Sequence, residues 1–263
     1  MSIYTIISPA KRLGSLARTK HMPATTTRPE FESTARELAL ILSRRSTSSL
    51  MDLMKISREL AELNRQRYQS FPADFAGPEL EPSILQFQGE VFQSLQIPEY
   101  GSKEHKYLKN YLGILSGMYG LLRPYDAMHP YRLEMGTRIS VQNARNLYQF
   151  WGKRITDAIN RNMSENRCKS LLSLASDEYA KCVDFSLIQG NIATAEFKEY
   201  RAGQWKVVSR NSKRARGTML NWIIWNRPAG ISALKKFNAG YEFAEEVADA
   251  NGIHRLVFHK TES

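Results

Sequence analysis

The segment Asn110–Arg138 constrains the fold of this chain more than any other stretch of the sequence. Its first half is an apolar run that contains Gly113, Gly117 and Gly120. Glycine is used where the backbone must come close to another group. Its second half contains Pro124 and Pro130, each of which fixes its own φ and disfavours α geometry in the preceding residue. The segment therefore predicts buried backbone followed by a rigid, irregular loop.

Charged and aromatic side chains crowd into this loop. They are Arg123, Tyr125, Asp126, His129, Tyr131, Arg132 and Glu134. A loop that is held rigidly can present such groups in a fixed geometry, which a binding site requires. The alternative is an ordered structural loop in which Arg132 and Glu134 form only a surface ion pair.

Length and charge set the frame for the function. With 263 residues, of which 42% are hydrophobic, the chain can build one large core, and we expect a single domain over residues 1–263. The 37 Lys and Arg residues outnumber the 26 Asp and Glu residues, so the formal charge is +11. A charge of this size indicates a polyanionic partner, although basic proteins without one exist.

The sequence predicts a cytoplasmic protein. No apolar run reaches the roughly 18 residues of a membrane span, and the N-terminus lacks the pattern of a secretory signal. Cys168 and Cys182 have no second cysteine pair and no nearby histidine, so we expect reduced thiols rather than a disulfide or zinc site. The five histidines are dispersed, and no metal or other cofactor is predicted.

Hydrophobic periodicity indicates a coarse order of elements. Strands are predicted at Ser2–Ser8, Ser170–Ala175 and His254–His259, with a hairpin formed by Ala193–Tyr200 and Gln204–Arg210. Helices are predicted at Pro29–Arg45, Leu50–Met54, Ser57–Tyr68, Leu147–Arg161 and Ala215–Trp225, and one from Ser176. Leu85–Leu95 is expected to begin as a strand and to become helical at Gly89.

Residues 50–68 suggest a helix-hairpin-helix element. Two short amphipathic helices are separated by Lys55-Ile56-Ser57, where the usual element carries two glycines. The turn and the N-terminus of the second helix would face a phosphate. The predicted DNA contacts are Lys55, Ser57, Arg58 and Arg65. Any amphipathic helical pair can give this apolar pattern by chance, and that alternative stays open.

Polar groups also follow two other predicted elements. Arg210, Lys213, Arg214 and Arg216 stand just before the predicted helix Ala215–Trp225, where they could contact phosphate or bases. Asp177 and Glu178 follow the strand that ends at Ala175, but acidic residues are also simply favoured at a helix N-terminus. We favour that structural interpretation of the two carboxylates.

Together these motifs resemble the YaaA family of peroxide-stress resistance proteins. The resemblance rests on SPAK (8–11), LMKISRELAELNRQR (53–67), FQGEVFQSL (87–95), LSGMYGLLRPYDAMHPYRLEMGT (115–137), LASDEYAKCV (174–183) and KRARG (213–217), which come in the family's order. GYEF (240–243) is similar to the C-terminal region of the family. Phe92 replaces the tyrosine of the family's GDVY motif, so this position carries no hydroxyl here.

The resemblance implies a cytosolic protein that limits hydrogen peroxide damage linked to intracellular iron. It implies an α+β domain with a mixed sheet surrounded by helices, a helix-hairpin-helix element and a positively charged cleft. It also implies binding to duplex DNA, including bent or distorted duplexes, with little sequence specificity. We expect a monomer with no membrane partner.

Two functions remain open from the sequence. The first is DNA binding, with a cleft built from Ser8, Lys11, Tyr119, Arg123, Tyr131, Arg132, Ser176, Tyr179, Lys181, Lys213 and Arg216. The second is an enzyme that acts on a nucleobase or nucleotide, or a site for a small anionic ligand, in the same cleft. Its acid or base would be Glu90, Asp126 or Glu134.

Overall fold

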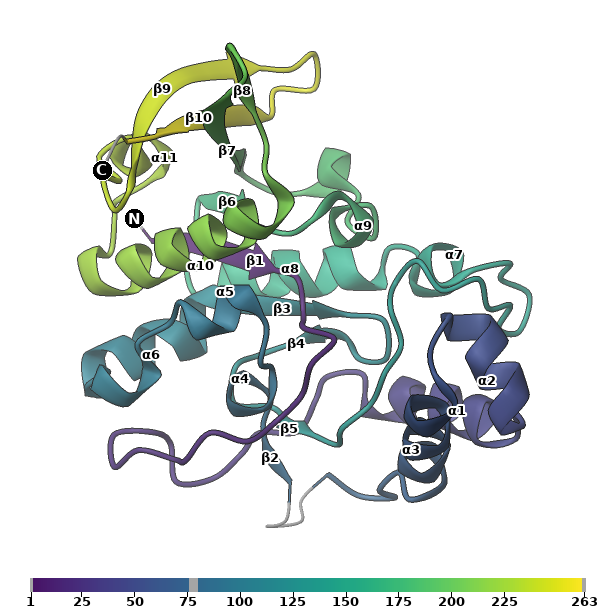
Figure 1. The fold of residues 1–263 in the computed structure, drawn as a ribbon. Helices are drawn as coiled ribbons and strands as arrows, with labels where there is room; N and C mark the ends of the chain where they lie inside the picture. Colours follow the sequence, from purple (N-terminus) through teal and green to yellow (C-terminus); the bar gives the residue numbers. More distant parts are fainter. Residues whose placement is uncertain (1, 76–79, 262–263) are drawn as a thin grey trace.

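A mixed sheet forms the centre of the molecule. The computed structural model describes residues 2–75 and 80–261 (Figure 1). In this part of the chain the main sheet has eight strands in the order β4-β3-β1-β6-β7-β10-β9, with β8 paired to β7. The parallel strands are β1 (Ile3–Ile7), β3 (Leu112–Ser116), β6 (Ser170–Ser173), β7 (Asn191–Arg201) and β10 (His254–Lys260). The antiparallel strands are β4 (Gly120–Leu122), β8 (Gln204–Lys206) and β9 (Tyr241–Ala248).

The parallel centre explains the apolar character of its strands. All residues of β1, β3 and β6 are buried. Parallel strands covered on both faces are nearly continuous hydrophobic runs, because neither face meets water. The prediction of a mixed sheet with surrounding helices is confirmed, but helices alternate with parallel strands along the chain. The fold is therefore α/β rather than the expected α+β.

Helices flank this sheet. Figure 1 shows α10 (Ser209–Asn226) running beside α5 (Glu90–Gln93) and α6 (Ser102–Tyr111). A separate helical group contains α1 (Glu32–Ser43), α2 (Thr47–Met54) and α3 (Arg58–Gln69). The remaining elements include α8 (Arg154–Glu165), which packs against β4. The others are α4 (Ser83–Gln86), α7 (Leu147–Trp151), α9 (Asp177–Ala180) and α11 (Ile231–Leu234), the 3-10 turns Ile97–Glu99 and Phe185–Leu187, and the small sheet of β2 (Glu81–Pro82) with β5 (Ala127–Met128).

Several predicted elements differ from the structure. The helix expected over Leu147–Arg161 is divided at Gly152, whose φ of 51° ends α7. Leu85 lies in α4 rather than in a strand. The basic stretch that begins at Ser209 forms the first turns of α10 instead of preceding the helix. Strand β9 was not predicted, because its exposed and buried positions carry no clear alternation.

One hydrophobic core unites the described residues. It extends from Ile3 to Phe258 and includes side chains from the sheet and from both helical groups. None of the helices in residues 2–75 and 80–261 is long and apolar enough to cross a membrane.

Candidate functional site

A cavity of about 310 Å³ lies where β1 and β6 end. Strands β1 and β6 are neighbours in the sheet. Strand β3 lies beside β1 towards one edge of the sheet, whereas β7, which follows β6 in the chain, lies beside β6 towards the other edge. In open α/β sheets, ligands bind at the carboxyl ends of the strands where the order reverses in this way. The lining residues come from five segments: Ser8–Arg12, Gly89–Phe92, Tyr131–Glu134, Leu174 to Tyr179 (Leu174, Ser176, Glu178 and Tyr179), and Lys213 with Arg216.

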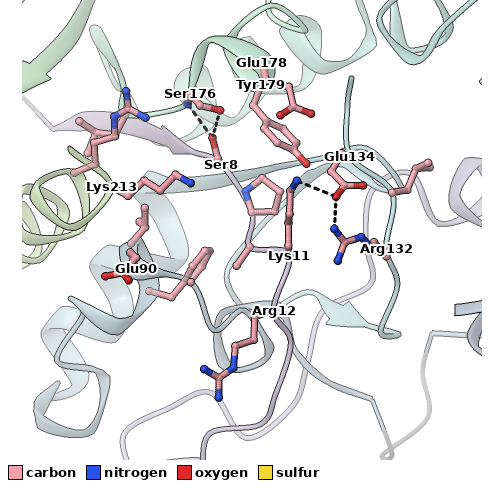
Figure 2. A pocket seen from close by; sticks show the side chains of 18 of the residues that line it. Ser8, Lys11, Arg12, Glu90, Arg132, Glu134, Ser176, Glu178, Tyr179 and Lys213 are labelled. Atoms are coloured by element: carbon pink, nitrogen blue, oxygen red, sulfur yellow. Dashed lines mark hydrogen bonds and ion pairs between the residues drawn. The ribbon is translucent and has the colours of Figure 1, made fainter. Parts of the chain in front are cut away.

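Two serines join the ends of the central strands. The backbone N–H of Ser176 donates a hydrogen bond to Ser8 Oγ at 2.9 Å, and the two hydroxyl oxygens are 3.2 Å apart (Figure 2). Ser8 follows β1 and Ser176 precedes α9, so this contact fixes the relative position of the two loops that form the floor of the cavity.

Glu134 lies between two cations. Arg132 Nη2 donates to Glu134 Oε1 at 2.8 Å, and Lys11 Nζ is 3.3 Å from the same oxygen (Figure 2). The side chains of Glu134 and Arg132 are only 13% and 17% exposed, whereas that of Lys11 is 68% exposed. The carboxylate and guanidinium are therefore held in place, and the lysine ammonium is free to turn towards a ligand.

The loop that carries Arg132 is anchored on its backbone side. Tyr68 OH, from α3, donates to the carbonyl oxygen of Arg132. The buried Tyr131 OH is 2.6 Å from Ser116 Oγ at the end of β3. Burial raises the pKa of Tyr131 and of Tyr179, so both phenols stay protonated at neutral pH. These contacts anchor the loop to α3 and to the end of β3.

Helix α10 forms the wall of the cavity opposite the loop that carries Arg132. Lys213 and Arg216 line the cavity, and burial lowers the pKa of Arg216. Glu90, at the start of α5, pairs with Arg210 Nε at 3.2 Å and lies 3.7 Å from Arg214 Nε. The cavity thus brings cations and carboxylates together, and the carboxylate of Glu90 already has Arg210 and Arg214 of α10 as partners.

The structure separates four predicted site residues from this cavity. Asp126 is fully buried, where its carboxylate accepts hydrogen bonds from Arg123 Nε at 3.0 Å and from Thr27 Oγ1 at 2.6 Å. Burial raises the pKa of Asp126 to about 6 although these partners oppose the shift. Tyr119 is also fully buried and donates to the carbonyl of His129. Asp126, Arg123 and Tyr119 therefore hold the central loop together, and Lys181 does not line the cavity.

One carboxylate that lines the cavity was not expected there from the sequence. Glu178 was expected only to favour the start of a helix, but it faces the cavity and its Oε1 accepts a hydrogen bond from the Gly136 N–H at 3.0 Å. The signal was its position directly after a buried strand. Arg12 and Phe92 also line the cavity without having been proposed as site residues.

A second, larger cavity of about 720 Å³ adjoins the first. The two share Lys11, Glu134 and Glu178. From these residues the second cavity extends along α2 to Lys55, and Arg45 and Arg138 also line it. We call the two adjoining cavities together the groove.

The groove ends at the turn between α2 and α3. Lys55 adopts a left-handed conformation with φ 54°, and Ser57 caps α3 by accepting a hydrogen bond from the Leu60 N–H at 3.4 Å, as its N-cap position predicts. Arg58 is exposed in the first turn of α3. Ser57, Arg58 and Arg65 do not line either cavity. Within residues 2–75 and 80–261, His, Cys, Asp and Glu side chains form no cluster that could hold a metal ion.

Comparisons with known proteins agree with the resemblance found in the motifs. The family model described as "Peroxide stress protein YaaA" matches residues 3–247. A UPF0246 protein of Legionella pneumophila (strain Lens) is 38% identical over 259 residues, which cover 97% of this chain and 99% of the relative. UPF0246 proteins of Polaromonas naphthalenivorans (38%, with 97% of each chain covered) and Clostridium beijerinckii (39%, with 93% of this chain and 94% of the relative covered) are similar. Because these matches extend over nearly the whole chain, it belongs to the YaaA family of peroxide stress proteins, whose relatives carry the name UPF0246.

Proposed function

We propose that this protein acts in the cytoplasm, as a monomer, by binding duplex DNA during peroxide stress. Binding has little sequence preference, favours bent or distorted duplexes and limits oxidative damage linked to iron. The family assignment supports the role in peroxide stress. The net charge of +11 supports a polyanionic partner.

The observation that carries this proposal is the continuity of the groove with the α2–α3 turn. The walls of its larger cavity present four cations, namely Lys11, Arg45, Lys55 and Arg138, together with the carboxylates of Asp52, Glu134 and Glu178. Glu134 pairs with Arg132, whereas Glu178 accepts a hydrogen bond from the neutral Gly136 N–H and keeps its charge. A DNA backbone that follows the groove meets cations whose charge the neighbouring acids only partly offset.

The turn provides a second contact of the helix-hairpin-helix type. Lys55 and Arg58 flank the N-terminus of α3, a helix of 12 residues whose first N–H groups favour an anion. Ser57 already caps one of these groups, and Glu59 stands in the same turn. We therefore assign most of the affinity at the turn to the side chains of Lys55 and Arg58.

A charge-reversal experiment tests the proposal. Lys55→Glu with Arg58→Glu should weaken binding of a duplex in a gel-shift titration by at least tenfold, without lowering the melting temperature. The matched control is Lys236→Glu with Arg255→Glu, which changes the net charge by the same amount at exposed positions outside the groove. Equal affinity of the two double variants would remove the turn from the interface.

An enzyme that acts on a nucleobase or nucleotide is the second candidate. It is favoured by the position of the smaller cavity at the reversal of strand order and by the nearly buried Glu134, which could serve as an acid or base. Glu134→Gln keeps the shape of this side chain. If it abolishes peroxide protection while duplex affinity is retained, chemistry in the cavity is supported over simple binding.

A further inference from the structure

We propose that the smaller cavity receives a single nucleobase that leaves the stack of the bound DNA. This inference rests on the proposed binding of duplex DNA. The cavity adjoins the larger cavity of the groove and shares Lys11, Glu134 and Glu178 with it. A duplex that lies along the larger cavity therefore passes beside the smaller one, which is where a base that swings out of the stack would be received.

The size and walls of the cavity suit one base. Its volume of about 310 Å³ is at the lower end of the range of roughly 300–1,000 Å³ for small-ligand pockets. Phe92, Tyr131 and Tyr179 line it with aromatic rings that are at most 7% exposed, and Leu174 adds an apolar surface. Enzymes that extrude a base commonly hold it between aromatic or apolar side chains.

Polar groups are placed to contact the edge of a base. Ser8 and Ser176 can each donate and accept, the carboxylate of Glu134 accepts, and the guanidinium of Arg132 donates. Arg132 Nε is buried without a hydrogen-bond partner among the described residues, so this guanidinium retains donor capacity beyond its pair with Glu134. The combination of donors and acceptors matches the mixed edge of a nucleobase better than a simple anion.

Exposed cations surround these groups. Figure 2 shows Lys213 reaching from α10 towards Ser8, with Lys11 and Arg12 on the other side. All three cations are exposed. They can contact the phosphates on either side of an extruded nucleotide, and each such contact is independent of sequence.

A cavity-filling variant tests the inference. Val91 lines the cavity with an uncharged side chain, so Val91→Phe, or the milder Val91→Leu if the first variant unfolds, fills space without removing a cation. The matched control is Val247→Phe on β9, where the side chain is 44% exposed. Binding is measured for three short duplexes that are fully paired, bent by a run of extra bases on one strand, or mismatched at one central pair.

The expected result separates extrusion from bending. The wild-type protein should bind the mismatched duplex about tenfold more tightly than the paired one, since a mismatched base costs less to unpair. Val91→Phe should reduce that preference to less than about twofold, because it weakens binding of the mismatched duplex more than binding of the paired or bent one. A mismatch preference that survives in Val91→Phe would overturn the inference while leaving DNA binding intact.

A failure of the proposed DNA binding would give a different set of binding results from a failure of the nucleobase site. If the wild-type protein binds none of the duplexes, DNA binding fails, and the cavity is tested with free nucleoside monophosphates by calorimetry. Binding that Val91→Phe removes would retain the nucleobase site and change only its source, from DNA to a free nucleotide. No binding of any monophosphate would reject the site itself.

Discussion

Gly217 lies so close to the carbonyl oxygen of Val91 that a Cβ added to the glycine would be 2.3 Å from that oxygen. Real Cβ atoms essentially never come within 3.0 Å of another heavy atom in this way. The approach brings α10 directly against α5, which places Lys213 and Arg216 on one wall of the cavity and Glu90 on the neighbouring wall. The glycine that ends the KRARG motif is therefore a packing residue that fixes the width of the site.

Gly217→Ala should destabilise the protein. Alanine gains about 1 kcal/mol in helix propensity at this position, but overpacking against a backbone oxygen costs typically 1–3 kcal/mol. A net loss of about 1 kcal/mol in the free energy of unfolding is expected, measured by urea denaturation. Thr218→Ala, on the same helix, should change stability by less than about 0.5 kcal/mol. A more stable Gly217→Ala protein would show that α10 can move away from α5 without loss.

Asp126→Asn should alter the pH dependence of stability. The pKa of Asp126 is about 6 in the folded protein against 3.8 for the free side chain, and burial is the main cause. A raised carboxyl pKa means that the folded state binds the proton more tightly, so the stabilisation is complete below pH 3.8 and is lost as pH rises through about 6. At about 1.4 kcal/mol per pKa unit, the stability of the wild type relative to the variant should fall by about 3 kcal/mol across this window.

Unfolding curves collected from pH 4 to 7 for both proteins measure this difference. Asp157→Asn, which removes an exposed carboxylate on α8, controls for the loss of one negative charge. A constant difference between wild type and Asp126→Asn over the whole range would mean that Asp126 does not titrate in this window.

Lys11→Ala and Arg132→Ala should each abolish peroxide protection. Both cations contact Glu134 at the junction of the two cavities, so either change alters the charge that faces a ligand. Survival of peroxide-treated cells that lack their own YaaA protein measures the effect, with Lys236→Ala as an exposed-lysine control. Lys11→Ala should retain wild-type thermal stability, because its side chain is largely exposed. Full protection by either variant would mean that the charged group around Glu134 has only a structural role.

Duplex affinity should depend steeply on salt. If about five to seven cations of the turn and groove neutralise phosphates, the logarithm of affinity should fall against log salt with a slope of roughly −5 to −6, about −0.9 for each contact. Competition between scrambled sequences should show little preference, because phosphate contacts carry no sequence information. A slope near about −1 with a strong preference for one sequence would point to a single phosphate contact and contradict the electrostatic account.

The sequence determined most of the local structure. The buried strand β1, the capped helix α3 and the hairpin of β7 and β8 were predictable because apolar periodicity, an N-cap serine and a turn containing Gly203 act within a few residues. The motifs also identified the family. The irregular course of the central loop followed from its prolines, and its Arg132–Glu134 pair was already an alternative from the sequence.

Only the tertiary structure decided which charged residues share a site. Asp126 and Glu134 are eight positions apart in one motif, yet the first is buried as a structural carboxylate and the second lines the cavity. Glu178, interpreted as a helix-start residue, lies in both cavities. The physical reason is that local patterns set backbone geometry, whereas the surroundings of a side chain depend on distant contacts. Here these are the pairing of β1 with β3 and β6 and the packing of α10 against α5, which join residues more than 100 positions apart.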